Sequence, residues 1–178
     1  MDLLAEFSAA QDRIKVQHCR WLKDRGVGQL GLFLEGGGFA FGIAEIEIQS
    51  DDSWMPMPGG REAMILYDEN EDGVDDLFAF FPKNPSRLFR RTNALRYLGC
   101  EHLYYARGMD EPLYLRATAV DWLVHGRTGT VIVDWDPLAL IMDLRGLVEI
   151  RADSEALGAK LQKALTQPFP CPPILVAS

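Results

Sequence analysis

Long apolar runs, paired cysteines and basic residues are all scarce in this chain of 178 residues. The longest apolar stretches, such as residues 130–135, fall far short of the roughly 18 residues that a membrane-spanning helix needs. The N-terminus has neither the basic start nor the apolar middle of a signal peptide. The three cysteines show no paired spacing, which argues against a disulfide framework. We therefore expect a cytoplasmic protein that does not associate with membranes.

Acidic residues outnumber basic ones by 26 to 18, and the net charge of -8 disfavours non-specific binding to nucleic acid or anionic lipid. The charges are segregated, because residues 51–76 contain nine acids and one base, whereas residues 83–96 contain five bases and no acid. These bases are Lys83, Arg87, Arg90, Arg91 and Arg96. Two interpretations are open: the segments lie side by side and neutralise each other, or the bases form a local face. Such a face would bind a phosphate-bearing ligand, a nucleic acid or a protein partner.

The apolar content of 48% is enough for a core, and the length fits a single domain over residues 1–178. Apolar residues at helical spacing predict a helix over residues 1–26. Alternation over residues 30–48 predicts antiparallel strands, and so do two apolar segments on either side of residues 68–76, which we call the acidic turn. Together they predict antiparallel β-hairpins at about 30–81, each with one solvated face. This antiparallel region extends over 27–110. Residues 53–60 are rich in Met, Pro and Gly, which predicts a loop. Trp54 in this loop is the one tryptophan that we expect to be exposed.

The last third alternates strand and helix patterns three times, which predicts a βαβαβα segment with parallel strands at about 113–167, within a region spanning 111–167. Asp136 and Pro137 are typical of the start of a helix that ends at Gly146, and Asp153 is expected to cap the final helix, which Pro168 ends. Residues 168–178 form a proline-rich tail. The fold class is therefore α+β, with an α/β C-terminal segment.

The acidic turn has the spacing of a calcium loop. Oxygen-bearing side chains stand at its positions 1, 3, 5 and 9 around Gly73, and a hard cation prefers six to eight oxygen ligands. The candidate ligands are Asp68, Asn70, Asp72 and Asp76. Position 12 is Ala79 where helix-loop-helix sites have a bidentate glutamate, so a solvated hairpin turn remains the alternative.

A second acidic pair, Asp134 and Asp136, follows the apolar strand predicted at 129–135. Ligands gather at the carboxyl ends of strands in open parallel sheets, so these acids could hold Mg²⁺. The alternative is that Asp136 caps a helix while Asp134 is solvated.

The segment LVEIRADSEALGAKLQKAL places an apolar strand before Asp153 and Glu155, with Gly158 positioned to let the next helix pack closely. This pattern resembles the acidic strand-to-helix motif of the Toprim domain of primases and topoisomerases, in which two acids at this spacing bind Mg²⁺. The stretch HCRWLKDRGVGQL is similar to a segment that precedes the catalytic core in some phage and plasmid primases. Toprim domains have a glutamate at the end of their first strand where this chain has Arg116. The resemblance implies a degenerate, non-catalytic relative.

From these patterns we expect a non-catalytic adaptor linked to DNA replication or a mobile element, which binds a protein or phosphate-bearing partner and needs no cofactor. The alternative is a Mg²⁺-dependent phosphotransfer enzyme or nuclease. Its catalytic residues would be Asp134, Asp136, Asp153 and Glu155. We expect bound Mg²⁺ only if that alternative is correct, and bound Ca²⁺ only if the acidic turn is a metal site.

Overall fold

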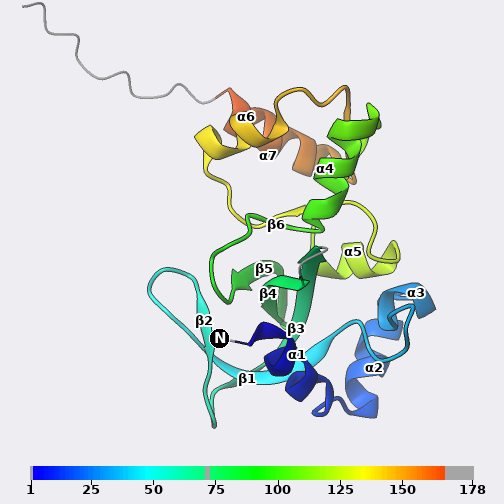
Figure 1. The fold of residues 1–178 in the computed structure, drawn as a ribbon, viewed down its shortest axis with the longest axis vertical. Helices are drawn as coiled ribbons and strands as arrows, with labels where there is room; N and C mark the ends of the chain where they lie inside the picture. The colour runs from blue at the N-terminus through cyan, green and yellow to red at the C-terminus, as the bar shows by residue number, and fades with distance from the viewer. Residues whose placement is uncertain (1, 71–72, 167–178) are drawn as a thin grey trace, which may run out of the picture.

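The computed structural model describes residues 2–70 and 73–166. In Figure 1 the first helices and a five-stranded sheet fill the lower part of the molecule, and shorter strands and helices fill the upper part. The lower part contains α1 (Leu3–Gln11), α2 (Val16–Lys23), α3 (Gln29–Leu32), β1 (Gly42–Ile48), β2 (Trp54–Pro56), β3 (Arg61–Asn70), β4 (Gly73–Phe81) and β5 (Asn84–Arg90). Among residues 2–70 and 73–166, no helix is both long and apolar enough to cross a membrane.

The C-terminal half alternates short strands with helices. It contains β6 (Tyr97–Leu98), α4 (Cys100–Met109), β7 (Leu113–Leu115), α5 (Ala119–Val124), β8 (Val131–Ile132), α6 (Pro137–Leu144), β9 (Ile150–Ala152) and α7 (Glu155–Leu165). The mixed α+β class that the sequence predicts is confirmed, including the antiparallel sheet and the later strand-helix alternation. Strands β2, β5 and β6 and helix α4 were not predicted.

The five-stranded sheet has the order β2-β1-β3-β4-β5, and every neighbouring pair is antiparallel. Strands β3 and β4 form the predicted hairpin, with Leu66 opposite Phe78. A single parallel bridge joins Ser53, just before β2, to Arg90 at the end of β5. This bridge brings the two outer strands of the sheet together.

Both faces of this sheet are buried at its centre, although the alternating pattern predicted one solvated face. Along β4, Leu77 and Ala79 pack in a cluster with α1, whereas Phe78 and Phe80 pack in another cluster with α2, α3 and α5. All four side chains are 0% exposed. The prediction was wrong here because helices distant in the sequence cover both faces.

The helix predicted over residues 1–26 is two helices. His18 Nδ1 accepts a hydrogen bond from the Lys15 N–H at 3.0 Å, at the start of α2. The break places Phe7 of α1 in the cluster on one face of the sheet and Leu22 of α2 in the cluster on the other. One straight helix presents a single apolar stripe and cannot cover two opposite faces. Tertiary packing therefore overrides the continuous apolar period.

Two apolar segments also differ from their predictions. Residues 30–34 were expected to form a strand, but residues 30–32 belong to α3. Here α3 packs closely on α5, because a Cβ on Gly31 would lie 2.0 Å from the Leu123 carbonyl oxygen. Trp54, expected to be exposed, is 1% exposed, and its Nε1–H donates to the Leu77 carbonyl oxygen at 3.3 Å. In both places a close contact with a distant element decides the structure.

The strands of the C-terminal half form two small ladders. Strands β7 and β9 pair in parallel, as predicted, whereas the partner of β8 is β6, in an antiparallel ladder. A parallel bridge between Leu115 and Thr130 connects the two ladders. Helices α6 and α7 and part of α4 enclose a separate apolar cluster on these strands.

The predicted helix starts are partly confirmed. Asp136 caps α6 by accepting hydrogen bonds from two backbone N–H groups, and Pro137 is its first residue. Ser154, not Asp153, caps α7, since Ser154 Oγ accepts from the Leu157 N–H at 3.2 Å. The end at Pro168 and the proline-rich tail lie outside the described residues.

Close helix packing at Gly158 is not supported, because a Cβ there would approach no atom more closely than 3.9 Å. We expect Gly158→Ala to raise the free energy of unfolding by about 0.5–1 kcal/mol, since alanine is the better helix former. Gly31→Ala should lower it by about 1–3 kcal/mol or more through overpacking against α5. Urea denaturation of both variants measures the contrast. Similar effects at the two positions would contradict the packing described here.

Candidate functional site

Two buried acids stand opposite each other on neighbouring strands of the sheet. Asp68 of β3 pairs with Asp76 of β4, and they are 6% and 0% exposed. The Asp76 carboxylate accepts backbone hydrogen bonds at 2.9–3.3 Å from the N–H groups of Leu77, Thr92, Ala94 and Leu95. Three of these donors belong to the segment that leaves the sheet for the C-terminal half. Asp76 therefore holds this segment in place.

Asp68 makes the second connection between the sheet and the C-terminal half. Its Oδ2 accepts hydrogen bonds from the Gly99 and Cys100 N–H groups at 2.7 and 2.9 Å, at the start of α4. Burial raises the pKa of Asp68 above 3.8, although these hydrogen bonds oppose the shift. Burial and the neighbouring Asp68 raise the pKa of the Cys100 thiol to about 12. At neutral pH Cys100 is therefore a protonated thiol and not a nucleophilic thiolate.

Of the four predicted calcium ligands, the structure describes the side chains of Asp68 and Asp76. Asp68 and Asp76 direct their carboxylates at backbone N–H groups. Asp72 and the side chain of Asn70 lie outside what the structure describes. Within residues 2–70 and 73–166, no group of three or more His, Cys, Asp or Glu side chains is placed to hold a metal ion.

The four acids of the alternative enzyme prediction do not form one cluster, because each has a different environment. Asp134 lies 3.4 Å from Arg90 Nη1, and Asp136 caps α6. Asp153 accepts a hydrogen bond from Arg116 Nη1 at 2.8 Å, and Glu155 is exposed in the first turn of α7. The strand before Asp134 pairs with β6, whereas the strand before Asp153 pairs with β7.

Most of the basic segment is engaged in ion pairs. Arg90 and Arg91 are only 17% and 15% exposed, and Lys83 is exposed in the turn before β5. The pairs are Arg87 with Asp52, Arg90 with Asp134, Arg91 with Glu6, and Arg96 with Asp134 and Asp143. Of these partners, only Asp52 belongs to the acidic segment. The two segments therefore neutralise each other at one point, and the other arginines bind acids elsewhere in the chain.

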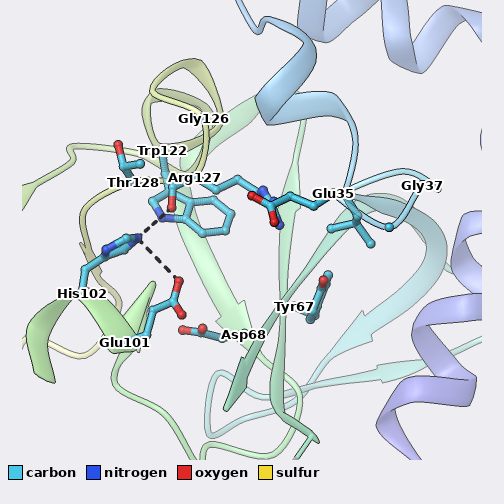
Figure 2. A pocket seen from close by; sticks show the side chains of 12 residues that line it. Glu35, Gly37, Tyr67, Asp68, Glu101, His102, Trp122, Gly126, Arg127 and Thr128 are labelled. Atoms are coloured by element: carbon cyan, nitrogen blue, oxygen red, sulfur yellow. Dashed lines mark hydrogen bonds and ion pairs between the residues drawn. The ribbon is translucent and has the colours of Figure 1, made fainter. Parts of the chain in front are cut away.

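A cavity of about 590 Å³ lies where the sheet meets the C-terminal half. Figure 2 shows its lining side chains, which come from the loop before β1, the end of β3, the start of α4, and α5 with the turn after it. The lining residues that carry chemistry are Glu35, Tyr67, Asp68, Glu101, His102, Trp122, Arg127 and Thr128. None of them except Asp68 belongs to a predicted site.

The turn after α5 is held by hydrogen bonds from three side chains. The carbonyl oxygens of three consecutive residues, 127 to 129, each accept a side-chain hydrogen bond. The donors are His102 of α4 at 3.1 Å, Arg116 at 2.9 Å and Trp122 of α5 at 3.0 Å. Because a carbonyl only accepts, the His102 proton must be on Nε2. This network fixes the backbone of the turn at the edge of the cavity.

Arg127 is strained within this fixed turn. Its φ of 67° is in the left-handed region that favours glycine, and its N–H donates to the Trp122 carbonyl oxygen at 2.8 Å. Its Nε is buried and has no hydrogen-bond partner in the described part of the chain. Strained residues persist where their surroundings over-determine them, and they cluster at functional sites. The unpaired donor likewise calls for an acceptor that this structure does not supply.

The cavity is predominantly acidic. Glu35 and Glu101 are exposed side chains at its rim, whereas Asp68 is buried in its wall. Glu101 Oε1 lies 3.6 Å from His102 Nε2. In Figure 2, Glu35 and Arg127 enter from opposite sides. The site thus offers a cation and several carboxylates around aromatic walls.

Sequence reasoning missed this cavity because its residues come from four distant segments with no common motif. The only local signal was the run Gly126-Arg127-Thr128-Gly129, which reads as a turn. Neither the left-handed conformation nor the buried donor at Arg127 follows from that composition.

Comparison of the chain with protein-family models, with curated proteins and with solved structures finds no match. The fold and the site therefore stand on their own geometry.

The two buried acids should respond differently to amidation. Asp68→Asn retains one oxygen for the Gly99 and Cys100 donors, so we expect a loss of about 1 kcal/mol or less in the free energy of unfolding. Asp76→Asn turns an amide group toward two of its four donors, and we expect a loss of about 3–5 kcal/mol. Urea denaturation at neutral pH compares the two. Equal losses would show that the four hydrogen bonds of Asp76 do not distinguish it.

The pH dependence provides an internal check on Asp68. The folded-state pKa of Asp68 lies above the unfolded-state value of 3.8. Between the unfolded-state and folded-state pKa, the native state therefore binds more protons than the unfolded state. The stability of the wild type relative to Asp68→Asn should therefore fall as the pH rises through this window. A relative stability that rises with pH would mean that the hydrogen bonds outweigh burial.

Arg91 should be a structural residue. Arg91 Nε lies 2.8 Å from Glu6 Oε1, and Nη1 donates to the Trp54 carbonyl oxygen at 3.4 Å. We expect Arg91→Ala to cost about 1–3 kcal/mol of unfolding free energy. The matched control, Arg87→Ala, removes an exposed pair and should cost at most about 0.5 kcal/mol. A small effect at Arg91 would instead favour a binding role for the basic segment.

Proposed function

We propose that this chain is a non-catalytic binding module whose small-molecule ligand occupies the cavity between the sheet and the C-terminal half. Arg127 carries the proposal. It is held in a strained conformation by surrounding hydrogen bonds, and its buried Nε lacks an acceptor in the described residues. The cavity volume of about 590 Å³ is within the range of roughly 300–1,000 Å³ of small-molecule sites.

Binding is favoured over catalysis because the candidate catalytic groups have other partners. Asp134 and Asp153 are each paired with an arginine, and Asp136 caps a helix. The raised pKa of Cys100 keeps its thiol protonated. A Mg²⁺ ion would have to displace these arginines, and a cysteine nucleophile would first have to ionise in a buried site.

The proposed non-catalytic role also agrees with the Toprim resemblance. Arg116 occupies the place where that family has a glutamate, and it forms an ion pair with Asp153 at 2.8 Å. An arginine there supplies the positive charge that a metal ion would otherwise bring to the acid. A link to DNA replication or a mobile element remains part of this proposal through the resemblance alone. A protein or phosphate-bearing partner remains part of it through the basic segment from Lys83 to Arg96.

The test is a thermal-shift screen with amino acids, polyamines, nucleotides, sugar phosphates and dicarboxylates. A ligand at ten times its Kd should stabilise the protein by about 1.4 kcal/mol, a shift of several degrees in Tm. Arg127→Gly should abolish this shift while changing the stability of the unliganded protein by at most about 1 kcal/mol, because glycine relieves the strain.

The matched control is Asp110→Gly, which changes an exposed residue that also has a positive φ, of 55°, but lies outside the cavity. It should retain every shift that the wild type shows. The proposal is wrong if no compound in the screen raises Tm, or if the shifts persist in Arg127→Gly.

A further inference from the structure

The cavity combines one guanidinium with an excess of carboxylates. Its lining contains Arg127 as the cationic side chain and Glu35, Asp68 and Glu101 as acids. Glu35 and Glu101 are exposed carboxylates, whereas burial raises the pKa of Asp68. A complementary ligand therefore has more positive than negative charges, but it also carries an acceptor for Arg127.

The charged groups reach the cavity from different elements, and in Figure 2 Glu101 lies apart from the ends of Glu35 and Arg127. Arg127 extends from the fixed turn, and its Nε is the buried donor without a partner in the described residues. Glu35 enters from the opposite side in Figure 2, and Glu101 stands in the first turn of α4 beside His102. A ligand that satisfies all three groups must be long enough to place charges at more than one point of the cavity.

The walls between these charged groups are partly apolar. Leu34 and the aromatic side chains Tyr67 and Trp122 line the same cavity. They suit the methylene stem of a flexible cationic ligand, because such stems pack on apolar surface while the charged ends reach polar groups. A phosphate ester fits less well, since its two negative charges would face the surrounding carboxylates.

We propose, on the basis of the binding role inferred above, that the ligand is a basic α-amino acid or a small molecule with the same charge pattern. Its carboxylate accepts hydrogen bonds from Arg127, and its two cationic groups bind Glu35 and Glu101. A bidentate contact between a guanidinium and a carboxylate is among the stronger charge-assisted hydrogen bonds in proteins. Net charge steers such a ligand toward this acidic protein.

Isothermal titration calorimetry with four compounds tests the charge pattern. L-Arginine has all three charges, agmatine lacks the carboxylate, L-citrulline lacks the side-chain cation, and L-glutamate has the opposite net charge. We expect L-arginine to bind at least tenfold more tightly than agmatine or citrulline, because each lacks one charge-assisted contact. L-Glutamate should bind least.

Variants then assign each contact. Arg127→Gly should bring the affinity for L-arginine down to that for agmatine, while Glu35→Gln and Glu101→Gln should each weaken L-arginine binding about tenfold. Glu47→Gln, an exposed glutamate of β1 outside the cavity, is the matched control and should change nothing.

Each contrary result has a distinct meaning. Tighter binding of L-glutamate than of L-arginine would overturn the inferred charge pattern, as would equal binding of agmatine and L-arginine. If none of the four compounds binds but another class in the thermal-shift screen acts through Arg127, this inference fails and the binding role stands. If no compound of either set binds, both fail.

Discussion

The buried carboxylate of Asp76 is the interaction on which the rest of the structure depends. It is 0% exposed, and three of its four donors belong to residues 92–95, which carry the chain away from the sheet. Beside it on β3, Asp68 accepts from the first N–H groups of α4. A turn-rich acidic sequence thus supplies the polar anchors by which the second half of the fold is attached. The acids are structural because they accept hydrogen bonds from backbone N–H groups that must be satisfied when they are buried.

The elements predicted correctly are those whose signal is local. The β3–β4 hairpin follows from alternation around a turn, and α6 follows from the capping pair Asp136 and Pro137. The wrong predictions were both overridden by contacts between distant parts of the chain. The predicted single helix is broken so that α1 and α2 can cover opposite faces of the sheet, and Trp54 is buried by contacts across the sheet. Charge segregation in the sequence identified the basic segment as a distinct feature. It could not show that its arginines pair with acids as distant in the sequence as Glu6 and Asp143.

The cavity could not be predicted for the same reason, since it exists only where four segments meet. Its position joins the two halves of the molecule: Glu35 and Asp68 come from the sheet side, and Glu101 and Arg127 from the C-terminal half. A ligand there would contact the same junction that Asp68 and Asp76 stabilise. Binding of such a ligand would therefore be physically linked to the attachment of the two halves, because a ligand that contacts both sides favours their packed arrangement.

The bridge between Ser53 and Arg90 has a consequence for association between chains. Sheets with long open edges recruit further strands, and natural proteins protect those edges. Here β2 has only three residues and ends in Pro56, whereas β5 carries Pro85 and Arg87 at its exposed end. Where the two outer strands approach, the bridge and the Arg87–Asp52 ion pair connect them. A second chain would therefore have to displace these contacts before it could extend the sheet, so the curled sheet disfavours strand-by-strand aggregation.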